Sequence, residues 1–240
     1  MNLKAIVGVG MLCALSGCAT VKPNNYSVPV EINLSLPMGL SKPIIFVYGY
    51  GGSKSEFESI ANNFDDRPIY YFEYDSTKEY IDVSGNNLAK LIKEFKDVDI
   101  IAHSMGGIVS RYALDTLACD YDGKIRLVTI DTPYHGFKSP PINLKGIVKR
   151  SWVDMLTNSE VMKNLYTDLP ENFEIYQFEA SKKDLIRGWN ELDTLNKEQL
   201  ENKINSLKNT KVVLEFEGDH TSILDNLYLI KELEKILRKK

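Results

Sequence analysis

Short apolar runs alternate along this chain with longer segments in which apolar residues recur every three or four positions. The short runs are typical of buried strands, and the longer spacing is typical of helices that turn one face to a core. Strands are predicted at Pro43 to Val47, Ile69 to Tyr74, Val98 to Ala102, Lys124 to Thr132, Phe173 to Phe178 and Val212 to Glu217. Because strands and helices alternate, the pattern predicts an α/β fold with a mostly parallel sheet of about six strands and helices on both faces.

Three of the intervening segments have clear helical spacing. Phe57, Ile60, Ala61 and Phe64 form the first apolar stripe, Asn87 to Lys96 contains the second, and Ile223 to Leu237 contains the last. Ser53 precedes the first stripe, and Glu56 lies three positions after Ser53, which is the spacing of a capping box. We therefore expect these two side chains to cap the first helix.

The N-terminal segment differs from the rest of the chain. Lys4 precedes an apolar run from Ala5 to Leu15 that is too short to span a bilayer as a helix, which is typical of an export signal. The sequence Leu15-Ser16-Gly17-Cys18 follows and resembles the lipobox of bacterial lipoproteins. That resemblance implies a signal peptide over 1–17 and lipid on Cys18. The alternatives are a plain secretory signal or an uncleaved anchor.

The residues after the signal predict a tether. Residues 18–42 contain several Pro and Asn residues without sustained periodicity, apart from one short edge strand expected at Val28 to Leu34. The folded domain is then expected over 43–240. A lipid anchor implies a membrane partner at the bacterial cell envelope, and Ala19 after the cysteine would favour the outer membrane in a Gram-negative source.

Composition supports one globular domain. The chain has 240 residues, of which 43% are hydrophobic and 26% charged. Its net charge of −4 gives no basic surface for nucleic acid. Lipid on Cys18 would leave Cys119 as the remaining cysteine of the mature chain, and we expect it to be a small core residue without a disulfide.

The segment around Ser104 carries the main candidate chemistry. An apolar run from Val98 ends at Ala102, small residues surround the serine, and Ile108 and Val109 continue at helical spacing. A strand that turns abruptly into a helix around a serine is the nucleophile-elbow pattern. Small neighbours are needed because strand and helix pass close together, and the helix N-terminus favours negative charge beside the serine.

This segment resembles the α/β-hydrolase superfamily, and most closely small lipases and esterases with the pattern A-x-S-x-G; the resemblance extends over about residues 42–240. The sequence from Tyr48 to Gly52 is similar to the H-G-x-G-G loop of lipases, with Tyr48 in place of the histidine. The resemblance implies that the amides of Tyr50 and Met105 form the oxyanion hole.

The resemblance also implies the other members of a catalytic triad. His220 lies in a Gly-Asp-His loop after the last predicted strand and is the implied base. Asp184, shortly after the preceding strand, is the best match for the acid, while Glu179 and Asp131 are lesser candidates. His135 follows another strand and is expected to be a structural loop residue or to line the pocket.

Residues 136–170 have weak periodicity and correspond in the family to an insertion over the active site. The segment is therefore expected to form a small cap or lid, although its apolar residues also fit ordinary packing onto the core. The implied function is a serine hydrolase that cleaves small-molecule or lipid carboxylic esters without a metal or organic cofactor. The alternatives are a thioesterase or amidase with the same triad, or an inactive envelope lipoprotein that acts as a binding module.

Overall fold

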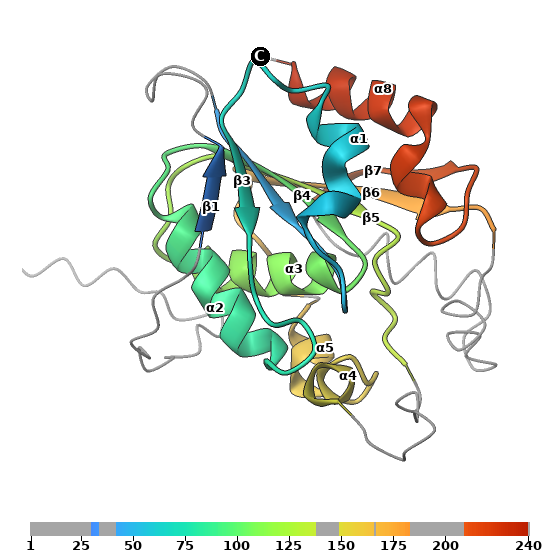
Figure 1. Ribbon diagram of the computed structural model, residues 1–240. Coiled ribbons are helices and arrows are strands. Elements are labelled where there is room, and N and C mark those ends of the chain that lie inside the picture. Colours follow the sequence, from blue (N-terminus) through green and yellow to red (C-terminus); the bar gives the residue numbers. More distant parts are fainter. Residues whose placement is uncertain (1–29, 34–41, 138–148, 166, 183–208, 240) are drawn as a thin grey trace, which may run out of the picture.

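The computed structural model describes residues 30–33, 42–137, 149–165, 167–182 and 209–239. In these ranges one sheet has the strand order β1-β3-β2-β4-β5-β6-β7 (Figure 1). Its strands are β1 Val30–Asn33, β2 Ile44–Val47, β3 Ile69–Phe72, β4 Val98–His103, β5 Ile125–Ile130, β6 Phe173–Ala180 and β7 Thr210–Phe216.

All neighbouring strands from β3 to β7 pair in parallel, and β1 alone in this sheet pairs antiparallel, along the free edge of β3. The predicted α/β-hydrolase fold with about six mostly parallel strands is confirmed, as is the short edge strand before residue 34. β2 and β4 lie at the centre, and every one of their residues is buried. Continuous apolar runs suit these strands because helices cover both faces of the sheet.

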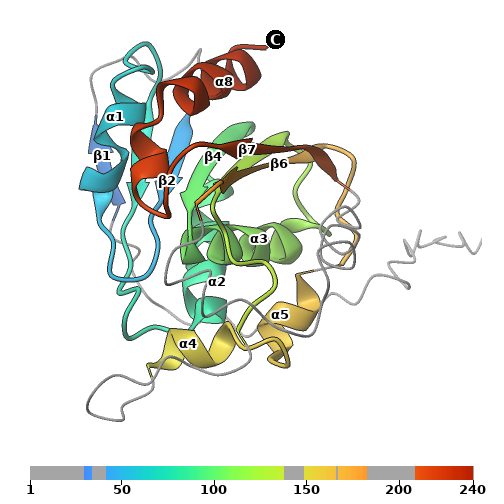
Figure 2. The ribbon, with the colours of Figure 1, turned by 90° about the vertical axis from the view of Figure 1, so that its right-hand side faces the viewer.

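Helices lie on both sides of the sheet (Figure 2). On one side lie α2 Ile81–Ile92 and α3 Met105–Leu117, with α4 Arg150–Asp154 and α5 Glu160–Asn164 beyond them. On the other side lie α1 Glu58–Ala61, preceded by the 3-10 turn η1 Lys54–Phe57, and α8 Leu227–Leu237, preceded by η2 Ser222–Asp225.

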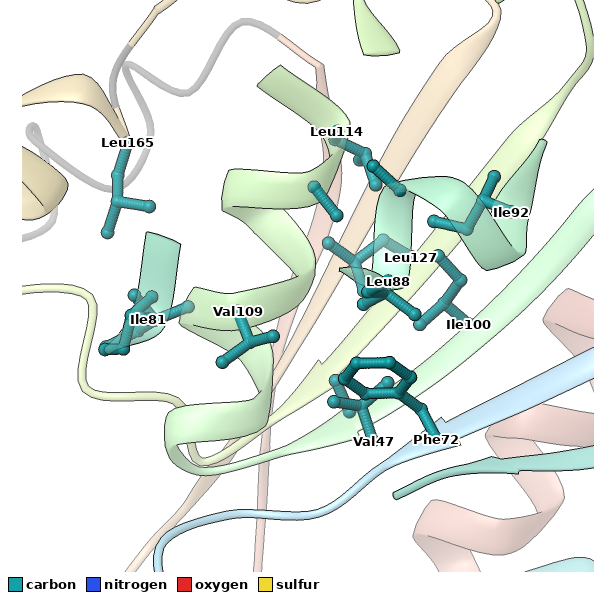
Figure 3. Close-up of a cluster of buried hydrophobic side chains, with 14 of the residues drawn as sticks. Val47, Phe72, Ile81, Leu88, Ile92, Ile100, Val109, Leu114, Leu127 and Leu165 are labelled. Carbon is teal, nitrogen blue, oxygen red and sulfur yellow. The ribbon is translucent and has the colours of Figure 1, made fainter. Parts of the chain in front are cut away.

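Each face of the sheet packs against its own apolar cluster. On the α2 and α3 side, Leu88 packs with Ile100 and Leu127 of the sheet (Figure 3). On the α1 and α8 side, Phe46 and Phe57 lie with buried residues of the closing helix. Burying one such side chain is worth roughly 1.5–3 kcal/mol, so these two layers provide most of the stability of the domain.

Helix α2 begins at Ile81, six positions before the start predicted from periodicity. Its first amide, Ile81 N, donates to Asp154 Oδ2 over 2.7 Å. A carboxylate satisfies an unpaired amide at a helix N-terminus, and here it comes from another helix, α4. A cap from so distant a residue leaves no local sequence signal.

Two further expectations are wrong. The side chain of Ser53 forms no capping hydrogen bond, and the Glu56 carboxylate turns toward Gly49 and His103 instead. Cys119 is exposed just after α3 rather than buried, and it is disulfide-bonded.

The chain's other cysteines, Cys13 and Cys18, lie outside the described residues, as do Asp184 and the proposed signal peptide. Within the described residues, no helix has the length and apolar character needed to cross a membrane.

Candidate active site

Ser104 lies at the sharp turn between β4 and α3, with φ 54° and ψ −128°. A non-glycine residue with positive φ is strained, and such strain persists only where the surroundings hold it. The Ser104 amide donates to Ile130 O on β5 over 2.9 Å. A Cβ on Gly106 would lie 2.2 Å from Val47 O, so only glycine lets α3 approach β2 this closely. The predicted elbow is confirmed.

Three buried side chains form a continuous hydrogen-bonded chain at the carboxyl edge of the sheet. His220 Nε2 lies 2.8 Å from Ser104 Oγ, and His220 Nδ1 lies 2.6 Å from Asp131 Oδ2. A carboxylate only accepts, so Nδ1 carries a hydrogen and Nε2 is left to accept from the serine hydroxyl. The three residues are 9%, 6% and 8% exposed, which keeps this chain of groups away from bulk water.

Asp131 therefore occupies the position beside the histidine for which the sequence favoured Asp184. It follows β5 directly, has φ 45°, and its Oδ1 accepts from Ala180 N over 3.0 Å. Its own amide donates to Phe178 O over 2.7 Å. Contacts to β6 thus aim the carboxylate at His220. Asp184 itself is not among the described residues, and Glu179, the other lesser candidate, lies on β6.

The loop that carries His220 is held by its neighbour Asp219. Asp219 Oδ1 accepts from the amides of Ser222 and Thr221 over 2.8 and 3.1 Å, and Asp219 N donates to Ser222 Oγ over 2.9 Å. The hydrogen bonds from Ser222 and Thr221 lower the pKa of Asp219 to about 2. The carboxylate is consequently ionised at neutral pH and shapes the turn rather than taking part in proton transfer.

The glycine loop after β2 is held by two tyrosines. Tyr48 Oη donates to Tyr74 O over 2.7 Å and accepts from Tyr74 N over 2.9 Å, while Tyr74 Oη donates to Tyr48 O over 2.6 Å. Gly51, with φ 70°, donates its amide to Ser76 Oγ over 2.9 Å. Tyr48, which replaces the family's histidine, thus fixes this loop against the end of β3. A Cβ on Gly49 would lie 2.6 Å from Ser104 Cβ, so the loop passes directly beside the serine.

Part of the predicted insertion packs against this loop. Trp152 of α4 contacts the ring of Tyr50 at a centroid distance of 5.2 Å and the ring of Phe137 at 5.0 Å. Phe137 N donates to Met155 O over 2.8 Å, which ties the segment to the chain that follows β5. Met155 and Met162 are buried in the α2 and α3 cluster. In the described part of the insertion, core packing thus accounts for buried apolar residues such as Met155 and Met162, and the lid role stays a prediction.

Three other predictions concern groups around the site. His135 is half-buried in the loop after β5, four residues beyond Asp131. No group of three or more His, Cys, Asp or Glu suited to a metal ion occurs among the residues that the structure describes. The oxyanion role of the Tyr50 and Met105 amides stays a prediction, although Met105 N stands at the N-terminus of α3, where backbone amides point outward.

Together, the sheet and the site define an α/β hydrolase with a serine–histidine–aspartate triad-like arrangement. Solved structures show the same fold. A Paleococcus ferrophilus monoacylglycerol lipase matches with TM-score 0.55 and 12% identity over 81% of this chain and 91% of that one. The Vlm2 thioesterase domain matches with TM-score 0.54 and 15% identity over 87% of this chain and 98% of that one. A carboxylesterase of Nitrososphaera gargenis matches with TM-score 0.53 and 14% identity over 91% of this chain and 95% of that one.

Residues 40–232 match the family described as "PGAP1-like alpha/beta domain". The chain belongs to this family, since the match spans most of its length. A search of curated proteins gave no match.

Proposed function

We propose that this protein is a serine hydrolase that cleaves carboxylic esters. The observation that carries the proposal is the buried sequence of contacts from Ser104 through His220 to Asp131, with distances of 2.8 and 2.6 Å. A serine hydroxyl is a weak nucleophile unless an adjacent base takes its proton. Here the base is in hydrogen-bonding contact, and its far nitrogen is held by a carboxylate.

The reaction proceeds in two halves. Ser104 Oγ attacks the ester carbonyl carbon while its proton moves to His220 Nε2, and the carbonyl π electrons move onto the oxygen. When this intermediate collapses, the C–O bond to the alcohol breaks and the leaving alkoxide takes the proton from His220. Water then attacks the acyl-serine with His220 as base, which releases the acid and restores the serine. Asp131 orients the imidazole throughout.

We propose that the amides of Tyr50 and Met105 stabilise the oxyanion. Two observations support this assignment: the glycine loop passes beside Ser104, and Met105 begins α3 directly after it. The amides of the flanking Gly49 and Gly51 are used to hold the loop, with Glu56 and Ser76 as acceptors. An oxyanion donor of this kind is worth about 3 kcal/mol of barrier lowering.

An apolar acyl group suits this site better than a charged one. Tyr50 and Trp152 are partly exposed next to the glycine loop, and α4 places the tryptophan there, packed on the buried ring of Phe137. Aromatic and apolar walls are typical of small-molecule sites. We therefore propose an ester of a fatty or other apolar acid as substrate, with residues 136–170 as the cap over it.

The test is an activity screen of the full-length protein in detergent, over p-nitrophenyl esters of increasing chain length, together with acyl thioesters and anilides. We expect ester turnover to exceed that of thioesters and anilides. Ser104→Ala should lower ester turnover at least about 1,000-fold, because the nucleophile is lost. Turnover that survives this substitution would exclude Ser104. Preference for thioesters or anilides would favour those substrates, and an inert wild type would favour a binding module.

We also propose that the chain is exported and anchored to the bacterial envelope through lipid on Cys18. The sequence Leu15-Ser16-Gly17-Cys18 after an apolar run supports this. Because acylation consumes the thiol of Cys18 and cleavage before it removes Cys13, the lipid anchor and an intrachain disulfide at Cys119 exclude each other. Palmitate labelling of the wild type and of Cys18→Ser, with the intact mass of the mature protein, distinguishes them. Label that persists in Cys18→Ser would overturn the anchor.

A further inference from the structure

A second histidine, His103, lies directly before the nucleophile and is only 4% exposed. Its Nε2 lies 2.7 Å from the backbone oxygen of His220, and its Nδ1 lies 3.2 Å from Glu56 Oε1. The two imidazole rings are 4.7 Å apart between centroids. His103 thus joins Glu56 of the η1 turn to the loop of the catalytic histidine, and the triad described above does not use it.

Hydrogen counting constrains this contact. A backbone carbonyl can only accept, so His103 Nε2 carries a hydrogen. A hydrogen bond between Nδ1 and Glu56 then needs one more hydrogen, either on the ring beside a carboxylate or on the carboxyl beside a neutral ring. The pair has zero net charge in both forms, which avoids an isolated buried ion. Glu56 and His103 therefore form one hydrogen-bonded unit.

The same carboxylate also reaches the glycine loop. Gly49 N lies 3.4 Å from Glu56 Oε1, the oxygen that faces His103. A Cβ on Gly52 would lie 2.5 Å from Glu56 Oε2, so the loop closes tightly around this side chain. Glu56 is half-buried under the loop that carries the proposed oxyanion donor. The unit therefore touches both parts that must be placed relative to Ser104: the histidine loop and the oxyanion loop.

We propose that Glu56 and His103 are a positioning pair that sets the His220 imidazole and the oxyanion loop around Ser104. This inference rests on the proposed hydrolase function. The pair acts through the backbone of the two loops and through the His103 ring beside the His220 ring, not as a proton donor or acceptor in the reaction. It acts by fixing the His220 carbonyl from one end and the Gly49 amide from the other. Small displacements of catalytic groups cost large rate factors, so the pair should affect kcat more than KM.

An amide cannot replace the carboxyl group in this role. If a glutamine oxygen takes the place of Oε1, it accepts from Gly49 N but faces an imidazole without a counter-charge. If the amide nitrogen takes that place, it donates to His103 but opposes the N–H of Gly49. Glu56→Gln therefore breaks one of the two links in either orientation. Glu58→Gln is the matched control, since Glu58 is exposed two positions later on the same side of the sheet.

His103 offers a matched pair of substitutions. Glutamine places its amide nitrogen near the position of Nε2 and can still donate to the His220 carbonyl. Asparagine is shorter, reaches only the position of Nδ1, and loses that donor. His103→Gln keeps the donor to the His220 carbonyl but loses the contact of Nδ1 with Glu56, whereas His103→Asn loses the donor to His220. Each should lower turnover about tenfold, because one hydrogen bond is worth about that factor.

The experiment measures kcat, KM, the rate of labelling by a fluorophosphonate and the melting temperature for the wild type and these four variants. We expect Glu56→Gln, His103→Gln and His103→Asn each to lower kcat and the labelling rate about tenfold, with KM within about twofold, while Glu58→Gln matches the wild type. A loss confined to His103→Asn, with Glu56→Gln and His103→Gln at wild-type rates, would overturn the role of the pair, as would losses that follow the melting temperature alone. A wild type that takes no label would instead overturn the hydrolase function on which the role rests.

Discussion

Two buried aspartates lie toward opposite ends of the neighbouring strands β4 and β5, and their partners differ in kind. Asp99, near the start of β4, contacts three cations: Lys42 at 2.6 Å, Arg67 at 2.6 Å and Arg126 at 2.8 Å. Asp131, just after β5, faces a single histidine at 2.6 Å. The first carboxylate lies among three cations, and the second lies beside the imidazole that we propose as the base.

The cation cluster serves the architecture. Arg126 also donates to Ile236 O and Leu237 O over 2.5 and 3.0 Å, at the carboxyl end of α8. Cations are favourable there because unpaired carbonyls and the helix dipole concentrate negative charge. Asp99 thus joins the amino end of the sheet to the last helix. Burial lowers the pKa of Lys42, and attraction to the Asp99 carboxylate offsets part of this shift. The difference teaches that burial of an aspartate does not by itself mark a catalytic site; an exchangeable partner beside a strained serine does.

The largest expected effect is on activity and comes from Asp131. Asp131→Asn should lower kcat by about 10³–10⁴-fold, because the amide no longer stabilises the required His220 tautomer and its charged form. Asp184→Asn is the matched control and should leave kcat within about twofold, as measured by ester hydrolysis. The opposite result, with Asp184 essential and Asp131 dispensable, would return the acid to the position that the family pattern favours.

The next effect concerns stability. Asp99→Ala would leave Lys42, Arg67 and Arg126 together without their carboxylate. Removing one member of a buried ion pair costs about 3–5 kcal/mol of unfolding free energy, and denaturant titration measures the loss. The folded fraction should retain its kcat at permissive temperature. A variant of unchanged stability with reduced kcat would show that the two ends of the sheet do not divide their roles in this way.

The smallest expected effect concerns a third carboxylate. Burial raises the pKa of Asp154 from 3.8 to about 6. The folded protein thus holds this proton more tightly than the unfolded chain does. The resulting stabilisation is fully present below the unfolded value and is lost as the pH rises through about 6.

Asp154→Asn should flatten the stability profile between about pH 4 and pH 6, by about 1 kcal/mol because solvent screens this half-exposed group. Thermal melts over that range measure the slope. The asparagine oxygen can still accept from Ile81 N, which controls for loss of the α2 cap. If the variant keeps the same slope of stability against pH, the slope belongs to another titrating group.

Local patterns predicted the order of strands and helices and the elbow at Ser104, because each depends on residues adjacent in the chain. The family resemblance pointed to His220, which the structure places beside Ser104. The first choice for the acid, Asp184, lies outside the described residues and stays a prediction. Asp131 was only a lesser candidate for the acid, because several carboxylates follow strands and only their placement shows that Asp131 meets the histidine. For the same reason Glu56 was assigned to a cap: its partners Gly49 and His103 lie on other elements. The start of α2 was missed since Asp154, its cap, is 73 positions away.

The most direct test of the central claim is covalent labelling of the wild-type protein with a fluorophosphonate, followed by peptide mapping. The account predicts one adduct per chain on the peptide that contains Ser104, formed quickly in the wild type, slowly in Asp131→Asn and not at all in Ser104→Ala. Absence of an adduct on folded wild-type protein, or an adduct at another serine, would contradict it.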